Sequence, residues 1–239
     1  MLSNIGNLLI IGSILLTISI IYSAFYNIGT KNLSIGKNLI YLSIFQITFI
    51  LISFLLLIFS FVYSDFSLLA VYQNSHTSKP IFYKIAGVWG NHEGSLLLWV
   101  NIMVIFSYLF FVFNTGSDKK YTLYTLLIQN ILILGFLIFL STDSNPFSRI
   151  IPTPSEGLGL NPILQDPALA IHPPLLYLGF VGSSIYFSAA IAAILSNSDG
   201  KKFARSIKVW ALVSWSFQSL GIIVGSIWAY YELGWGGFW

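Results

Sequence analysis

Residues 39–63 read LIYLSIFQITFILISFLLLIFSFVY and contain no charged side chain. About 20 apolar residues are enough for an α-helix to cross the hydrocarbon core of a bilayer. Five further stretches have the same character, namely residues 5–26, 95–113, 121–140, 173–195 and 206–230. The sequence therefore predicts an all-α fold, a polytopic membrane bundle of about six transmembrane helices that forms a single membrane domain over residues 1–239.

The composition excludes several classes of protein. Hydrophobic residues make up 56% of the 239 residues and charged residues only 8%, against about a quarter charged in soluble domains. This excludes a soluble enzyme, a disordered chain and a nucleic-acid binder, despite the net charge of +3. The chain has no cysteine, which excludes disulfides, Cys-ligated zinc, iron–sulfur clusters and thiol catalysis within it. Its surroundings are membrane lipid, and no nucleic-acid partner is expected.

The loops between the predicted spans differ in charge and length. Because loops rich in Lys and Arg stay on the side of insertion, the second and fourth loops and both termini are expected on the outer side. These two outer loops, residues 65–94 and 142–172, are long, and all eight prolines lie in or beside them. Long ordered loops are often functional. The inner loops hold eight cations, Lys31, Lys37, Lys119, Lys120, Lys201, Lys202, Arg205 and Lys208, and the outer loops hold three, Lys79, Lys84 and Arg149.

The span centres contain no ionisable residue, which argues against ion translocation by this chain. Their polar exceptions are amides, which more often bind helices to one another than line a substrate path. Gly221 and Gly225 indicate a close-packed helix face. The amides are Gln46, Asn101, Gln129, Asn130 and Gln218.

All three histidines lie in the outer loops or at helix starts, and imidazole is the usual protein ligand of haem iron. His172 precedes Pro173 and Pro174, which are tolerated in the first turns of a helix and stiffen its entry. The sequence allows two roles for His172, a ligand of haem iron or an N-terminal cap of the helix. Asp166 either orients the imidazole through its second nitrogen or caps a turn before Pro167.

The second histidine lies in VWGNHEGSLLLW, residues 88–99. His92-Glu93 invites comparison with the zinc-protease signature, but that signature needs a histidine at position 96, which is leucine. A zinc site is therefore excluded here, and Glu93 at a helix start is explained by the helix dipole. The surroundings of His76 are typical of a turn.

The sequence ends with WAYYELGWGGFW, residues 228–239. Aromatic residues at the end of a span commonly form an interfacial belt, which explains Trp228 and Tyr230. Glycines between aromatic rings also let a flat ligand approach the backbone and stack. A tetrapyrrole is such a ligand, so residues 225–239 are a candidate haem-binding segment.

Three segments, residues 84–99, 145–177 and 225–239, resemble the N-terminal part of CcmF, the haem lyase family of the cytochrome c maturation system. The second segment, which ends in His-Pro-Pro-Leu-Leu-Tyr, is highly specific. The third resembles the opening of the family's tryptophan-rich WWD domain, which normally continues with Trp-Asp-Pro-Val-Glu-Asn, whereas this sequence ends at Trp239. Residues 1–70 match only in hydrophobic character.

The resemblance implies that haem b is held at the outer face and attached covalently to apocytochrome c. It implies that His172 is an axial ligand of the iron and that a second axial histidine comes from another chain. This chain would then be one part of a haem lyase complex, not active alone, and no catalytic residue is assigned to it. The haem-binding residues expected on this basis are His172, Trp228, Trp235, Phe238, Trp239, Trp89 and His92.

The expected partners are a polypeptide carrying the rest of CcmF, a haem chaperone, a thiol-handling maturation subunit and apocytochrome c. A split family member and the richness in Ile, Phe, Asn, Ser and Lys favour the mitochondrial inner membrane, with the long loops and Trp-rich segment facing the intermembrane space. The alternative is a bacterial inner membrane, with those segments facing the periplasm.

Two other functions stay open at this point. One is a structural subunit of a respiratory or assembly complex without its own haem. The other, half of a transporter, predicts discontinuous helices that line a solute path and pairs of polar residues in mid-span, and neither is recognisable in the sequence.

Overall fold

A computed structural model describes residues 2–30, 33, 36–114 and 118–234. Six stretches of helix in this part are long and apolar enough to cross a membrane, which confirms the predicted all-α bundle. Two short helices and a 3-10 turn lie between the spans. The elements are α1 (Leu2–Gly29), α2 (Lys37–Val62), α3 (Leu69–Asn74), α4 (Ile81–Gly87), α5 (His92–Asn114), α6 (Lys119–Thr142), η1 (Pro162–Leu164), α7 (Pro167–Phe180), α8 (Ser183–Ser196) and α9 (Gly200–Glu232).

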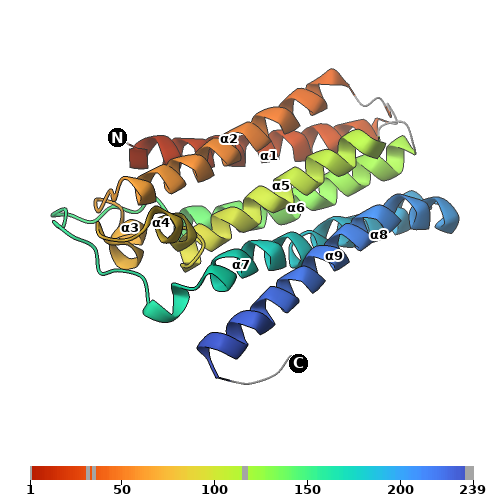
Figure 1. The fold of residues 1–239 in the computed structure, drawn as a ribbon. Helices are drawn as coiled ribbons and strands as arrows, with labels where there is room; N and C mark the ends of the chain where they lie inside the picture. Colours follow the sequence, from red (N-terminus) through yellow and green to blue (C-terminus); the bar gives the residue numbers. More distant parts are fainter. Residues whose placement is uncertain (1, 31–32, 34–35, 115–117, 235–239) are drawn as a thin grey trace.

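Helix α5 lies at the centre of the bundle (Figure 1). Within its most apolar stretch, 61% of the residues are buried, against 11% for α9. Helices α1 and α2 pack on one side of the α5–α6 pair, and α7, α8 and α9 pack on the other. Helix α9 is attached mainly through α7, so the placement of α9 depends on the α7 surface.

Three of the five mid-span amides, Gln46, Gln129 and Asn130, join helices as the sequence predicts, whereas Asn101 donates to the Leu97 carbonyl within α5. The Nε2 of Gln46 donates to Oγ1 of Thr17 at 2.7 Å and to Oδ1 of Asn130 at 2.9 Å, which links α2 to α1 and α6. Gln129 on α6 accepts from Ser188 on α8 at 2.7 Å. Hydrogen bonds of this kind stabilise contacts between helices in lipid, so Gln46, Gln129 and Asn130 are explained as structural.

The fifth span differs from its predicted range of residues 173–195. It begins at Pro167, because the Asp166 carboxylate accepts a hydrogen bond from the Leu169 amide at 3.0 Å and caps the helix. His172 therefore lies inside α7 and not at the end of a loop. The span is also interrupted between α7 and α8 at Gly182, where an added Cβ would lie 2.7 Å from the Phe106 ring.

The two long loops pack on each other and form a cap over one end of the bundle (Figure 1). The cap comprises residues 65–91 and 143–166, including α3, α4 and η1. Leu68 and Arg149 form an antiparallel bridge. The Leu158 amide donates to the Tyr72 carbonyl at 2.8 Å, and the Gly159 amide donates to the Ser75 carbonyl at 3.0 Å. The loops are therefore ordered by each other.

A carboxylate strengthens this connection within the cap. Both the hydroxyl and the amide of Thr77 donate to Glu156, at 2.6 and 3.0 Å. Together with the Gly157 amide, these donors lower the pKa of Glu156 to about 2. Burial and the nearby Lys84 ammonium lower the pKa of Lys79 to about 8. Glu156 is therefore ionised at neutral pH and holds the two loops together.

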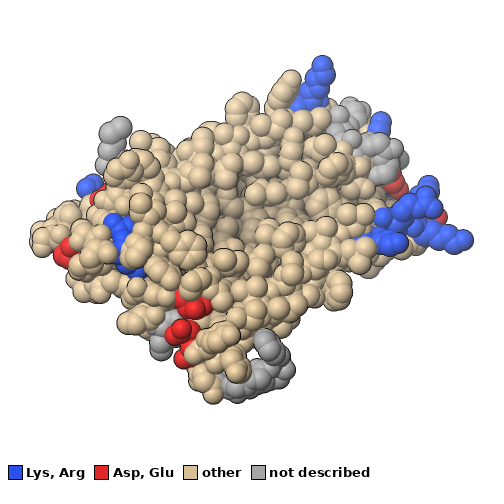
Figure 2. All heavy atoms as spheres, viewed as in Figure 1, with Lys and Arg blue, Asp and Glu red and all other residues tan. Residues whose placement is uncertain are grey.

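Most of the Lys and Arg side chains visible in Figure 2 lie at the end of the bundle opposite the cap. The cations described at this end lie in the first turns of α2, α6 and α9. Both ends of the described chain lie at the cap end, since Ser3 donates to the Phe147 carbonyl at 2.8 Å and the last turns of α9 pack beside the start of α7. The Lys and Arg residues that the sequence assigns to the inner side thus gather at one end of the bundle, and the long loops lie at the other end.

Candidate functional site

The first half of α7 contains an unusual deficit of backbone donors. Pro173 and Pro174 lie inside the helix, and proline has no N–H. In an α-helix each amide donates to the carbonyl four residues earlier, so the carbonyls of Leu169 and Ala170 lose their normal donors. Ala170 is buried, with only 5% of its surface exposed. A buried carbonyl of this kind requires another donor.

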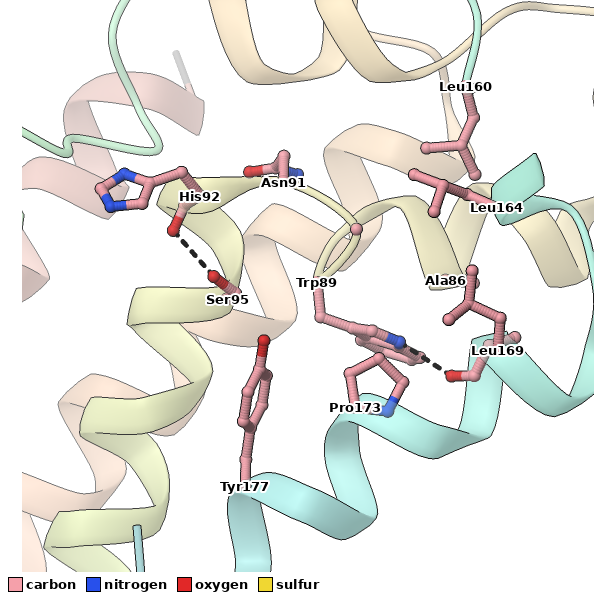
Figure 3. Close-up of a pocket in the computed structure, with 12 residues that line it drawn as sticks. Ala86, Trp89, Asn91, His92, Ser95, Leu160, Leu164, Leu169, Pro173 and Tyr177 are labelled. Carbon is pink, nitrogen blue, oxygen red and sulfur yellow. Dashed lines mark hydrogen bonds between the residues drawn. The ribbon is translucent and has the colours of Figure 1, made fainter. Parts of the chain in front are cut away.

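Trp89 supplies a donor to one of these carbonyls. Its indole Nε1–H donates to the Ala170 carbonyl at 2.9 Å, and the indole lies beside Pro173 (Figure 3). Trp89 belongs to the turn between α4 and α5, 81 residues earlier in the sequence. The bond thus joins the Trp-Gly-Asn-His-Glu-Gly motif to the His-Pro-Pro motif, a connection that the residue pattern does not predict.

His172 is held by a backbone carbonyl of α9. Its Nδ1 lies 2.7 Å from the Gly221 carbonyl oxygen. A carbonyl can only accept, so Nδ1 carries the proton in this bond. In the neutral imidazole, Nε2 then keeps its lone pair. Asp166 does not orient the ring, because its carboxylate caps the helix, and the orienting role belongs to Gly221.

Helices α7 and α9 pack antiparallel along a seam of small residues. A Cβ added at Gly179 would lie 2.7 Å from Cα of Gln218, and one added at Gly221 would lie 2.7 Å from the Leu176 side chain. A Cβ at Gly225 would overlap the His172 imidazole. The glycine at 225 therefore lets the imidazole lie directly against the α9 backbone.

Trp228 lies one turn beyond Gly225, on the same face of α9. The structure thus brings the His172 ring and Trp228 to neighbouring turns of one helix pair. The Nε1 of Trp228 is buried and has no hydrogen-bond partner among the described residues, and the same holds for Oε1 of Gln218. An unpaired buried donor costs about 1–3 kcal/mol. The remaining aromatic residues of the predicted site, Trp235, Phe238 and Trp239, lie outside the described residues.

A pocket of about 320 Å³ lies on another face of α7, against the turn that carries Trp89 (Figure 3). Its α7 lining consists of Leu169, Ala170, Pro173 and Tyr177, whereas His172 faces α9. Trp89 therefore contacts α7 on a different face from the one on which His172 meets α9.

His92 begins α5, and its ring points away from Trp89 (Figure 3). Its Nδ1 lies 2.8 Å from Oγ of Ser144, and the ring lies edge-on to Phe139 at 6.1 Å between centroids. His76 lies in the cap, with Nδ1 2.9 Å from Oγ of Ser78. The described contacts of these two histidines are thus made with the cap and α6. That Trp89 and His92 contact haem stays a prediction.

Comparison with known proteins gives a consistent set of relatives. The chain is 50% identical over 187 residues to the cytochrome c-type biogenesis protein CycK of Rhizobium meliloti, covering 78% of this chain and 28% of CycK. It is 47% identical over 188 residues to CcmF of Escherichia coli, covering 78% and 29%. A solved structure described as Cytochrome c Heme Lyase CcmF matches with a TM-score of 0.80 and 26% identity, over 100% of this chain and 37% of that one.

These relatives confirm the resemblance to the N-terminal part of CcmF, and the chain spans under a third of the length of the two curated relatives. The bacterial relatives and the six apolar helices together indicate that this chain is an inner-membrane protein with a role in cytochrome c maturation. The family model described as Cytochrome C assembly protein matches residues 89–239, more than half of the sequence. The chain therefore belongs to the cytochrome c assembly protein family.

Proposed function

We propose that this chain holds haem b at the cap end of the bundle, as part of a haem lyase that attaches haem to apocytochrome c. His172 would ligate the iron through Nε2. The observation that carries the proposal is the bond between Nδ1 of His172 and the Gly221 carbonyl. It leaves Nε2 as the nitrogen that can bind a metal.

This geometry fits an axial ligand. Metal-binding histidines commonly donate their second ring N–H to a carbonyl or carboxylate, which fixes the tautomer and the ring plane. Here the carbonyl is at 2.7 Å, and Gly225 brings the ring against a helix backbone. An imidazole held in this way is presented in one orientation, as a haem ligand requires.

Trp228 supports a porphyrin surface beside His172. It lies on the neighbouring turn of α9, and its buried indole N–H lacks a partner among the described residues. An acceptor on haem, or one from the polypeptide that carries the rest of CcmF, would satisfy this donor. We propose that Trp228, Trp235, Phe238 and Trp239 line the porphyrin, by stacking of aromatic rings.

The contribution of this chain to the reaction is positioning. Haem supplies the vinyl groups to which the apocytochrome thiols add. Side chains that fix the haem plane bring those groups near the thiols and exclude water, which lowers the entropic part of the barrier. The second axial histidine would come from another chain, the polypeptide that carries the rest of CcmF.

The proposed partners are a polypeptide with the rest of CcmF, a haem chaperone, a thiol-handling maturation subunit and apocytochrome c. We propose a mitochondrial inner membrane, with the cap facing the intermembrane space. This orientation is supported by the basic first turns of α2, α6 and α9, which lie at the other end of the bundle, because basic segments stay on the side of insertion. In a bacterial membrane the cap would face the periplasm.

His172→Ala should remove most of the haem from the purified complex, at least fivefold relative to the unmodified chain, since one of two axial bonds is lost. Haem is measured by the pyridine haemochrome assay against protein content. His76→Ala is the matched control, because its ring contacts Ser78 within the cap, and it should leave haem content unchanged. Full haem retention by His172→Ala would leave a structural subunit without its own haem as the better account.

Gly225→Ala tests the seating of the imidazole without removing it. The added methyl group overlaps the ring, so the ring must leave the α9 backbone, and haem content should fall severalfold. Gly135→Ala on α6 is the control, because a Cβ there meets no atom within 4 Å. Equal haem content in the two variants would contradict the proposed seating.

The absence of cysteine allows the orientation to be measured with single cysteines. Ser78→Cys lies exposed in the cap, and Gly200→Cys lies exposed at the basic end. A membrane-impermeant maleimide applied to the intermembrane-space or periplasmic side should label Ser78→Cys at once and Gly200→Cys only after the membrane is permeabilised. The reverse pattern would invert the proposed topology.

A further inference from the structure

We infer that Trp89 is a positioning residue for His172, because its indole N–H replaces a backbone donor that Pro174 cannot supply. The consequence of this bond for haem rests on the proposed function above. The consequence for α7 does not, because it follows from the hydrogen bonds of this chain alone.

The missing donor is a matter of helix geometry. The N–H of residue 174 would normally bond to the carbonyl of residue 170, and Pro174 has none. Ala170 is buried, and its carbonyl accepts instead from Trp89 at 2.9 Å. The carbonyl lies two positions before His172, so this bond holds the turn of α7 that carries the imidazole.

Trp89 can serve as a fixed donor because its own turn is closed by hydrogen bonds. The amide of Gly90 donates to the Ala86 carbonyl at 3.0 Å. The Asn91 side chain donates to the Gly87 carbonyl at 2.7 Å and accepts from the Gly94 amide at 2.8 Å. A side chain at position 94 would overlap the Val88 carbonyl. The Trp-Gly-Asn-His-Glu-Gly motif thus builds a rigid support for one indole.

The turn of α7 is consequently held from two sides. Trp89 bonds to Ala170 on the pocket face, and the Gly221 carbonyl bonds to His172 on the α9 face. Without the Trp89–Ala170 bond, only the hydrogen bond to the Gly221 carbonyl would orient the imidazole. Through its bond to Ala170, Trp89 acts on the candidate iron ligand by way of the α7 backbone.

Trp89→Phe removes the N–H and keeps an aromatic ring in the pocket. In the purified haem-free complex, hydrogen–deuterium exchange of the α7 amides should become about two- to tenfold faster, the range expected for one net hydrogen bond. Trp215→Phe on α9 is the matched control, since its side chain is 68% exposed, and its α7 exchange should equal that of the unmodified chain.

Pro174→Ala provides the rescue, because it returns a backbone N–H to the Ala170 carbonyl. In the Pro174→Ala background, Trp89→Phe should change α7 exchange less than twofold. A simple packing role for Trp89 would give the same acceleration in both backgrounds, and that result would overturn the inference.

The haem-loaded complex separates this inference from the proposed function. Trp89→Phe should shift part of the haem absorption spectrum from the low-spin to the high-spin form, because one axial bond weakens. If His172→Ala loses haem while Trp89→Phe matches Trp215→Phe in both exchange and spectrum, the positioning role is wrong. If Trp89→Phe accelerates exchange and is rescued by Pro174→Ala while His172→Ala keeps its haem, the positioning role stands and the haem-binding proposal fails.

Discussion

A proline inside a membrane helix removes a hydrogen bond in surroundings where water cannot replace it. Helix α7 contains two such residues in succession, immediately after His172. The carbonyl freed by Pro174 is satisfied by an indole from a distant motif. This requirement ties the turn between α4 and α5, and through it the cap, to the helix that carries the candidate ligand. The cap is thus more than a cover for the bundle, because it fixes the conformation of α7.

The pairing of α7 with α9 is the second half of the site. Helix α9 is scarcely buried elsewhere, and its glycine seam brings its backbone to α7. Gly221 provides the carbonyl that selects the His172 tautomer, and Gly225 provides the space for the ring. Because Trp228 lies on the next turn of α9, the same seam also determines where Trp228 lies relative to the imidazole. The orientation of the His172 imidazole and the position of Trp228 therefore both depend on the glycine seam between α7 and α9.

Much of the fold could be predicted from the sequence, because six long apolar stretches allow few alternatives in a bilayer. His172 was identifiable because it is one of three histidines and precedes a proline pair. The sequence allows Asp166 either to orient the His172 imidazole or to cap a turn before Pro167, and in the structure its carboxylate caps α7. The true start of α7 at Pro167 follows from that cap. Gly182, at the break between α7 and α8, has no space for a Cβ beside the Phe106 ring, a tertiary feature that local sequence does not encode.

The partners of the site were the part that sequence could not provide. The acceptors for His172 and Trp89 are backbone carbonyls, and a carbonyl is present at every position, so it leaves no signal in the residue pattern. The donor deficit at Ala170 was in principle readable from Pro174, but the choice of Trp89 as its donor depends on how α4, α5 and α7 meet. The residues at 235–239 lie outside the described structure, so the aromatic surface beyond Trp228 rests on the sequence.

The most direct measurement of the central claim is an electron cryo-microscopy structure of the complex purified with haem. We expect the iron within bonding distance of Nε2 of His172, with Nδ1 still donating to the Gly221 carbonyl and the porphyrin in contact with Trp228. An iron held by two other histidines, or a porphyrin remote from the end of α9, would contradict it.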